Sequence, residues 1–332
     1  MKSKDQGAAG RLRVGFILAR SFTLSAFALF VDTLRLASDE QDRSGRVRAD
    51  WQVLGSTRHL IASSCGVQVA PTSDFADPAS YDYIVVVGGL LKCENPIDTE
   101  TKNFLKKAAA AKVPLLGVCT GTFVLAEAGL MKGHEVCVSW LHFQEFRERF
   151  PELKVRSDRL FNLDPQRGSC AGGSSAADLA AYIVRHHISK EAERNALEVL
   201  QIDKARSHLD VQPRKPLSLD FKDPRLKAAL IIMEQHTEDV ISVQQLADAV
   251  GVSRRQLERL FSSKTNTSPA AIYKMVRLER AKTLVTHTKA PLVEIAVEVG
   301  FESASHFARV FRKTFGQSPT RLRAELASAT SL

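Results

Sequence analysis

The sequence contains one turn that could expose a nucleophile. The apolar run Val113–Val118 leads into Cys119, and glycines stand two residues before and two residues after it, at Gly117 and Gly121. A glycine-flanked turn from a strand into a helix exposes the central side chain at the carboxyl end of the strand. Because the thiolate is the nucleophile, a thiol there reacts only when a neighbouring base removes its proton. The pattern predicts either a reactive Cys119 or a binding surface shaped by the same turn.

Other small and polar residues are expected near this turn. Tyr83–Val87 and Glu135–Val138 are further strand candidates, and each is followed by small or polar residues. Ligands bind outside the carboxyl ends of the strands of an open α/β sheet, so these segments predict one crevice for a small molecule. Its expected members are Gly88, Gly89, Cys119, Thr120, Ser139, Trp140 and His142.

Two members of this crevice have alternative roles. Trp140 either stacks on a cationic or apolar ligand or anchors the core. His142 is either the base for Cys119 or an ordinary histidine of the surface or core. The five cysteines contain no CxxC pair and the histidines lack the spacing of metal ligands, so we expect neither a disulfide framework, nor a metal, nor a cofactor.

The elements that must position the crevice alternate along the chain. From Leu12 to about Asp203, strand-like runs alternate with helical patterns, which predicts an α/β fold with a doubly wound, mostly parallel sheet. The strand candidates are Arg13–Leu18, Trp51–Gly55, Tyr83–Val87, Val113–Val118 and Glu135–Val138. The helix candidates are Leu24–Ala37, Thr99–Ala111, Gly121–Ala128 and Ser174–His187.

Length and punctuation predict a second domain. At 332 residues the chain exceeds the ~250–300 residues that one core usually supports. His208–Leu219 carries two prolines among charged residues, as expected of a linker. We predict a tail at 1–11, an α/β domain at 12–205, a linker at 206–222, an all-α domain at 223–324 and a tail at 325–332. No apolar run reaches the ~18 residues of a membrane span, so a cytoplasmic protein is expected.

Positive charge is concentrated in the C-terminal third. The formal net charge is +9, and Ser253–Arg323 contains fourteen Lys and Arg residues against five acidic ones. This excess fits a partner with a phosphate backbone, although a solvated basic face would give the same count.

An internal repeat in this segment favours DNA as the partner. The pattern LAxxVGV at 246–252 returns as IAxxVGF at 295–301, and LxRLF at 257–261 returns as FxRVF at 307–311. Each copy predicts an apolar helix, a turn with Gly and a second helix capped by Ser, which is the layout of a helix-turn-helix. Ser242 with Gln245 and Ser253 with Gln256 have the spacing of capping boxes.

The run from Pro291 to Arg323 resembles the signature of the AraC family of transcription regulators, and the similarity extends over about Pro224–Ala324. The resemblance implies seven helices, with two recognition helices joined by a long helix, here Ala270–Thr286. Such a connector lets the recognition helices enter successive major grooves about 34 Å apart.

The exposed faces of the two recognition helices carry the candidate DNA contacts. Arg suits guanine, whereas Glu, Ser and His can bond other base edges. The candidates for bases are Arg254, Arg255, Glu258, Arg259, Ser305, His306 and Arg309, and those for phosphates are Lys264, Arg312 and Lys313. A solvated charge explains any single surface Arg equally well, but Arg259 and Arg309 occupy the same place in both copies.

The region around Cys119 resembles the DJ-1/PfpI branch of the class I glutamine amidotransferase-like fold, a flavodoxin-like architecture, from Leu12 to about Asp203. The enzymes of this group carry a His immediately before the residue equivalent to Trp140, where this chain has Ser139. They also carry a Glu shortly after the first strand, where this chain has the sequence RSFT at 20–23. The missing base favours a ligand-binding surface, so we assign no catalytic residue.

These features together predict a DNA-binding regulator that is not an enzyme. The resemblance implies an activator of a catabolic operon for an amino acid or a quaternary amine, controlled by a metabolite bound in the N-terminal domain. Promoter DNA, RNA polymerase and a second copy in a homodimer are the expected partners. The alternatives are a Cys119-dependent hydrolase or glyoxalase-like enzyme, or a cysteine redox sensor, each fused to a DNA-binding domain.

Overall fold

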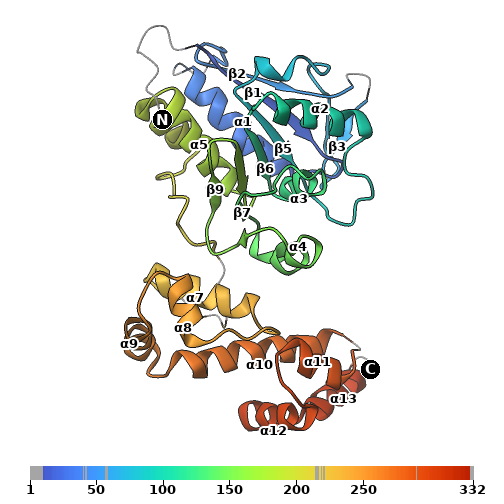
Figure 1. Cartoon of the computed structure of the whole chain (residues 1–332), viewed down its shortest axis with the longest axis vertical. Helices are drawn as coiled ribbons and strands as arrows, with labels where there is room; N and C mark the ends of the chain where they lie inside the picture. Colours follow the sequence, from blue (N-terminus) through green and yellow to red (C-terminus); the bar gives the residue numbers. More distant parts are fainter. Residues whose placement is uncertain are drawn as a thin grey trace. The chain divides into compact units, whose positions relative to one another are not determined.

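The computed structural model describes residues 10–39, 41, 43–56, 59–213, 217, 219, 221–288 and 290–329, without the side chains of 287 and 325–329. The chain divides into two compact units, Met1–Gln212 and Pro213–Leu332 (Figure 1). They are named the first and the second unit. Most of the predicted N-terminal tail, the end of the C-terminal tail and parts of the predicted linker lie outside the described residues.

A six-stranded sheet forms the centre of the first unit. In spatial order its strands are β2 (Ala49–Val53), β1 (Leu12–Leu18), β5 (Tyr83–Val87), β6 (Leu115–Val118), β10 (Arg167–Cys170) and β9 (Phe161–Leu163). Neighbouring strands are parallel except β10 and β9, which are antiparallel. The predicted mostly parallel α/β sheet is therefore confirmed, and four of the five strand candidates lie in it.

The fifth strand candidate, Glu135–Val138, lies outside this sheet. Its residues form β7 (Val136–Cys137), which pairs with β8 (Val155–Arg156) in a separate two-stranded sheet. A further two-stranded sheet joins β3 (Ile61–Ala62) and β4 (Gln68–Val69). Strands β9 and β10 were not expected, because their short sequences lack the apolar alternation of the other candidates.

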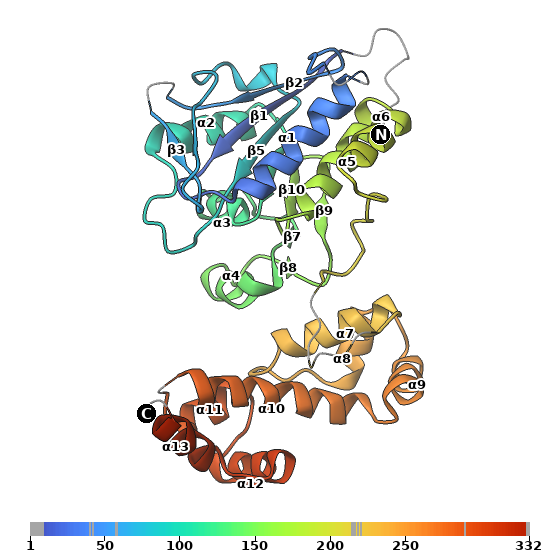
Figure 2. The same ribbon diagram turned by 180° about the vertical axis from the view of Figure 1, so that it is seen from behind.

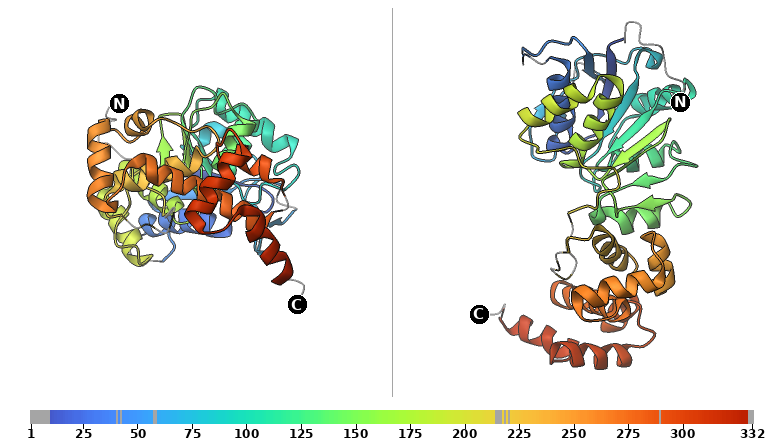
Figure 3. Two further views of the ribbon diagram at one scale, coloured as in Figure 1. Left: turned by 90° about the horizontal axis from the view of Figure 1, so that it is seen from below. Right: turned by 90° about the vertical axis from the view of Figure 1, so that its left-hand side faces the viewer.

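Helices cover both faces of the six-stranded sheet (Figures 2 and 3). On one face α1 (Leu24–Ser38), α5 (Ser175–His187) and α6 (Lys190–Val199) share a core with the strands. On the other face lie α2 (Thr99–Ala110), α3 (Gly121–Glu127) and α4 (Phe143–Arg149). The short helices η1 (Pro78–Ser80) and η2 (Trp140–His142) complete the unit. The sheet is thus buried on both sides, as parallel sheets generally are.

Residues 203–212, named the strap, end the first unit. Arg206 binds the buried carboxylate of Asp178 on α5: its backbone N donates at 2.7 Å, Nε at 3.1 Å and Nη2 at 2.6 Å. Gln212 is 3% exposed, and its amide binds the backbone of Val138, Trp140 and Arg159. The first part of the predicted linker is therefore packed onto the α/β unit.

The second unit consists of helices only, within the residues that the structure describes. They are α7 (Pro224–Gln235), α8 (Val243–Ala249), α9 (Arg254–Thr265), α10 (Pro269–His287), α11 (Leu292–Glu298), α12 (Ala304–Phe315) and α13 (Pro319–Ala329). The long α10 runs through both halves of this unit (Figure 1). Its first half, with Tyr273 and Val276, joins one core, and its second half, with Leu278 and Leu284, joins another.

Local sequence signals explain where these helices begin. Ser242 and Gln245 form a capping box at α8, and Ser253 and Gln256 form one at α9. Each box satisfies two backbone N–H groups that the first turn of a helix leaves without a partner. In the second copy, the side chain of Ser303 accepts from the backbone N of His306 and starts α12. The two predicted capping boxes are confirmed.

The carboxyl end of β5 approaches the chain after β1 very closely. Gly89 forms an antiparallel bridge with Phe22, and a Cβ added to Gly89 would lie 1.6 Å from the carbonyl oxygen of Ser21. Only a residue without a side chain fits this approach without moving the backbone. Gly89 therefore fixes the edge of the sheet at which the crevice was predicted.

We expect Gly89→Ala to lower the free energy of unfolding of the first unit by about 1–3 kcal/mol or more, because the added methyl group must displace backbone. Thermal unfolding of the full chain measures the change. Gly10→Ala is the matched control, because no atom lies within 4 Å of a Cβ at that position. Equal stability of the two variants would contradict the role assigned to Gly89.

Candidate functional site

The turn at Cys119 has the geometry of an exposed elbow. Cys119 directly follows β6 and has φ +57°, a left-handed conformation that side chains rarely adopt, and α3 begins two residues later. The residue is partly exposed. The structure thus confirms the sharp strand-to-helix turn that the glycine spacing predicted.

Residues that follow two other strands of the sheet contact Cys119. The Thr23 hydroxyl lies 3.4 Å from the Cys119 sulfur. The Gly172 backbone packs so closely that an added Cβ would lie 2.7 Å from Cβ of Cys119. Sequence reasoning missed Thr23 as a partner of the thiol, because its only signal was its place after the first strand.

Four of the seven predicted crevice residues meet at this edge of the sheet. Thr120 Oγ1 donates to the carbonyl oxygen of Gly89 at 2.9 Å, and the backbone N of Thr23 donates to that of Gly88 at 2.9 Å. These bonds link the end of β5 to the elbow. Gly88, Gly89, Cys119 and Thr120 therefore form one small constellation.

The other three predicted residues have different partners. The Ser139 hydroxyl accepts from the backbone N of Leu141, and the backbone N of Trp140 donates to the Gln212 side chain. The His142 ring packs edge-on against Phe123, with centroids 6.2 Å apart. Among the described residues, neither Ser139 nor His142 forms a hydrogen bond with Cys119.

The chemistry available to Cys119 follows from these partners. A threonine hydroxyl does not remove a proton from a thiol near neutral pH. Burial lowers the pKa of His142, so this imidazole is mostly neutral at pH 7. Cys119 therefore lies on the kind of turn that exposes a nucleophile, but among the described residues no base lies at hydrogen-bonding distance from its thiol.

A small cavity, which Cys119 does not line, borders one side of this constellation. This cavity of about 40 Å³ touches Gly89 and Thr120 and is bordered by Glu127 and Arg149, which form an ion pair. This volume is far below the roughly 300–1,000 Å³ of pockets for small organic ligands. Within the described part of the chain, no cluster of three or more His, Cys, Asp or Glu residues could hold a metal ion. In the same residues, no helix is long and apolar enough to cross a membrane.

The predicted recognition helices are α9 and α12, and both expose the expected face. Leu257 and Phe261 of α9 and Phe307 and Phe311 of α12 are fully buried. The side chains on the outer face include Arg255, Arg259, Lys264, Ser305, His306, Arg309, Arg312 and Lys313. None of the basic ones, Arg255, Arg259, Lys264, Arg309, Arg312 and Lys313, forms an ion pair with another described residue, so their charges are available to a partner.

Two candidates for base contacts already bind each other. Arg254 Nε donates to Glu258 Oε1 at 2.9 Å, one helical turn away. Such an exposed pair contributes little, on the order of 0.3–0.5 kcal/mol. The bond uses only Nε of Arg254 and Oε1 of Glu258, so the terminal nitrogens of the guanidinium and the second carboxylate oxygen stay available to a partner.

Helix α10 fixes the position of both helix-turn-helix copies. The Tyr273 hydroxyl donates to the carbonyl oxygen of His236 at 2.6 Å and accepts from the backbone N of Ile241 at 3.3 Å, in the loop before α8. One turn further along α10, Arg277 Nε donates to the carbonyl oxygen of Val299 at 2.7 Å, in the turn before α12. Sequence reasoning missed both residues.

The turn before α12 also contacts the loop before α8. Gly300 has φ +70°, and a Cβ added to it would lie 2.6 Å from Val240 and 2.7 Å from the carbonyl oxygen of Thr237. Arg277 donates to the carbonyl oxygen of Gly300 as well and stacks on the Phe301 ring at 4.6 Å. The two helix-turn-helix copies are thus connected through packed backbone and not by α10 alone.

Comparisons with known proteins define the class of this chain. A family model described as the DJ-1/PfpI family matches residues 16–154, and one described as a helix-turn-helix domain matches residues 246–325. The chain belongs to the AraC family of helix-turn-helix transcriptional regulators, and its first unit is a DJ-1/PfpI domain. Both resemblances inferred from the sequence are confirmed.

Several relatives share this architecture over most of their length. The HTH-type transcriptional regulator GbdR of Pseudomonas aeruginosa is 33% identical over 308 residues, 92% of this chain and 82% of GbdR. The regulator CdhR of the same organism is 30% identical over 318 residues, 94% of this chain and 91% of CdhR. GlxA of Rhizobium meliloti is 28% identical over 312 residues, 94% of this chain and 95% of GlxA.

Similarity to one solved structure supports the fold and carries no conclusion about function. The ThiJ/PfpI family protein of Pseudomonas syringae is 16% identical and superposes with a TM-score of 0.50, covering 75% of this chain and 98% of that protein.

We expect Arg277→Met to destabilise the second unit by roughly 1.5–3 kcal/mol, because it removes charge-assisted hydrogen bonds to two backbone carbonyls. Urea unfolding of the full chain, followed by circular dichroism, measures the change. Arg280→Met is the matched control on the same helix, since its ion pair with Glu298 is exposed and worth ~0–1 kcal/mol. A destabilisation no larger than that of the control would show that Arg277 does not hold the turn.

Proposed function

We propose that this protein is a sequence-specific activator of a catabolic operon for an amino acid or a quaternary amine, switched by a metabolite that binds the first unit. The observation that carries the proposal is the pair of exposed arginines, Arg259 and Arg309, at the same place in two capped recognition helices. Arginine bonded to guanine is the commonest specific contact in the major groove.

The relatives support the regulatory part of this proposal. GbdR and CdhR are both named as transcriptional regulators and match this chain along nearly its whole length. The transcriptional activator RhaS of Escherichia coli is 32% identical over 106 residues, which cover 38% of that protein. An activator acts on RNA polymerase at a promoter, in the cytoplasm, and we propose a homodimer as the binding form.

The first unit serves as a sensor and not as an enzyme in this proposal. Cys119 has Thr23 as its hydrogen-bond partner, Ser139 stands where the related enzymes have a His, and the His142 ring packs on Phe123. The seven predicted crevice residues remain candidates for contact with the effector. A partly exposed thiol also makes a cysteine redox sensor the second candidate function.

We expect Arg259→Ala and Arg309→Ala each to relax base preference at one position, by ~1–3 kcal/mol for the bidentate pair of hydrogen bonds that each arginine would form with a base. Lys313→Ala should instead weaken binding equally on all sequences and reduce the slope of log affinity against log salt by ~0.9, the effect of one phosphate contact. Footprinting and salt titration measure both effects.

The same experiment on the fragment of residues 220–324 tests the central claim. Preferential protection of one DNA sequence by this fragment is the expected result. A fragment that protects every sequence equally would refute sequence-specific regulation by this domain.

We expect Cys119→Ser to retain the transcriptional response to the metabolite, because the thiol shapes its surroundings without performing chemistry. The purified wild-type protein should convert no metabolite. A reporter assay and a turnover assay with the wild type as control measure these outcomes. Turnover that disappears on substitution would reveal an enzyme, and a peroxide response that disappears while DNA binding persists would reveal a redox sensor.

A further inference from the structure

The two helix-turn-helix copies can be compared position by position. Helices α9 and α12 each have 12 residues and begin directly after a serine, Ser253 or Ser303. In both, the serine side chain accepts from the backbone N of the third helical residue. The buried side chains follow at the same places in both helices. Because cap and core match, a residue of α9 and its counterpart in α12 project in the same direction from their helices.

Helix α12 presents an apolar group on its outer face. Ala304 in the first turn packs against a core of the second unit, and the His306 ring packs edge-on against Phe301 with centroids 5.5 Å apart. Ala308, one turn further on, is partly exposed. In the part of the second unit that the structure describes, it belongs to neither core. Its methyl group is therefore available to a partner.

The matching position of α9 carries a negative charge. Glu258 is the counterpart of Ala308, and its Oε1 accepts from Arg254 Nε at 2.9 Å, which leaves the second oxygen available. A glutamate placed on a thymine methyl group would lose hydration without gaining a hydrogen bond, but it can accept from the amino group of cytosine. The methyl group of an alanine has the opposite preference, because it can pack on the C5-methyl group that thymine presents in the major groove.

The residue that follows this position is the same in both copies. Arg259 and Arg309 are exposed and form no ion pair with another described residue. Arginine can pair with guanine through two hydrogen bonds. The two helices therefore offer one contact in common and differ at the residue before it.

We propose that the two helices read half-sites of different chemistry: Glu258 of α9 accepts from a cytosine amino group, and Ala308 of α12 packs on a thymine methyl group. This inference rests on the proposed function and deepens it by assigning a base to each of the two positions. A site of this kind has a direction. Turning it end for end would place Glu258 on the thymine methyl group and Ala308 on the cytosine amino group, so the protein binds it in one orientation.

The first test removes single methyl groups from the DNA. A duplex with the sequence that the full chain protects preferentially is made with deoxyuridine in place of each thymine in turn, which keeps every hydrogen-bonding group of the base pair. We expect one replacement in the α12 half-site to weaken binding roughly fourfold, the effect of burying one methyl group. Ala308→Gly should bind the thymine and uridine duplexes equally well.

Each variant is compared with itself on the two duplexes, so the lower helix stability of Ala308→Gly does not imitate a lost contact. Lys313→Ala is the control, because it should weaken both duplexes alike and keep the ratio between them. A wild type that binds every uridine duplex as tightly as the thymine duplex would overturn the methyl contact. A ratio that persists in Ala308→Gly would assign that contact to another residue and overturn the proposal as well.

The second test exchanges the two side chains. Glu258→Ala should change the preferred base at one position of the α9 half-site from cytosine to thymine. Ala308→Glu should change one position of the α12 half-site from thymine to cytosine. Selection of binding sites from random duplexes by the full chain measures both preferences. An unchanged preference in either variant would overturn the base assigned to that position.

Footprinting separates this inference from the proposed function. A wild type that protects one DNA sequence preferentially, together with failure of both tests, would overturn the assigned bases and leave sequence-specific regulation intact. Absence of preferential protection would overturn the proposed function itself.

Discussion

Double-stranded DNA presents its major groove on one face about every 34 Å, and a protein that inserts two helices must hold them at that repeat. In this chain the requirement falls on α10, whose 19 residues span roughly 28 Å. The length of α10 alone would not suffice. A helix-turn-helix copy joined to each end of α10 only by a flexible loop could rotate independently of the other copy. Tyr273 and Arg277 remove that freedom by bonding the loop before α8 and the turn before α12. These contacts determine where the exposed arginines of α9 and α12 project.

The parts of the fold that could be predicted are those with local signals. A capping box needs two residues three positions apart, and Ser253 with Gln256 shows that the signal is contained in the sequence. By contrast, β10 is made of Arg, Gly, Ser and Cys, and becomes a strand because β6 and β9 flank it. The contact of Thr23 with the thiol could not be predicted from local sequence either, because its partner Cys119 is 96 residues away. In the candidate site, helical periodicity correctly predicted the exposed faces of α9 and α12, whereas Ser139 and His142 were placed beside Cys119 on the assumption that β7 belonged to the main sheet.

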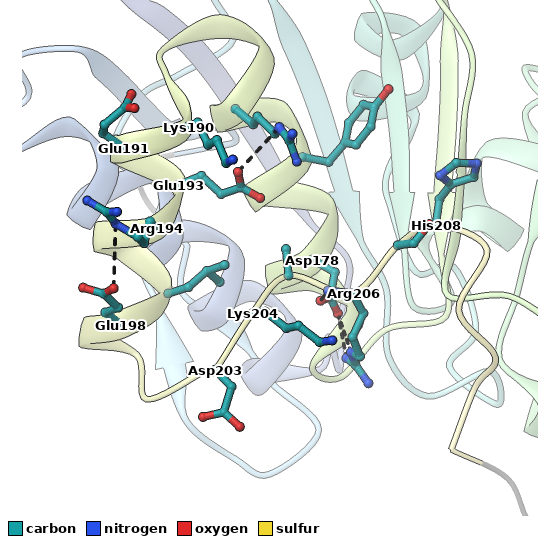
Figure 4. Close-up of a pocket in the computed structure, with 15 residues that line it drawn as sticks. Asp178, Lys190, Glu191, Glu193, Arg194, Glu198, Asp203, Lys204, Arg206 and His208 are labelled. Carbon is teal, nitrogen blue, oxygen red and sulfur yellow. Dashed lines mark hydrogen bonds and ion pairs between the residues drawn. The ribbon is translucent and has the colours of Figure 1, made fainter. Parts of the chain in front are cut away.

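The first unit keeps the backbone turn of a nucleophile elbow although no base lies at hydrogen-bonding distance from Cys119 among the described residues. The backbone at Cys119 keeps a left-handed conformation, which costs energy that the packing around Gly88, Gly89 and Thr120 must offset. A larger, open groove of about 620 Å³ lies between α5, α6 and the strap (Figure 4), among residues whose charges, seen in sequence, resemble an ordinary solvated face. A cavity lined by three separate segments of the chain produces no periodic pattern in the sequence, so it could not be predicted from the sequence.

The division of α10 between two cores has a thermodynamic consequence. Each half of the second unit comprises roughly 50 residues, a size at which a single core is only marginally stable. Because one helix completes both cores, order in either half favours order in the other. A DNA half-site that captures the first recognition helix therefore lowers the entropic cost of presenting the second. Coupling between the two predicted recognition helices is in this way a property of how the second unit folds, and requires no direct contact between α9 and α12.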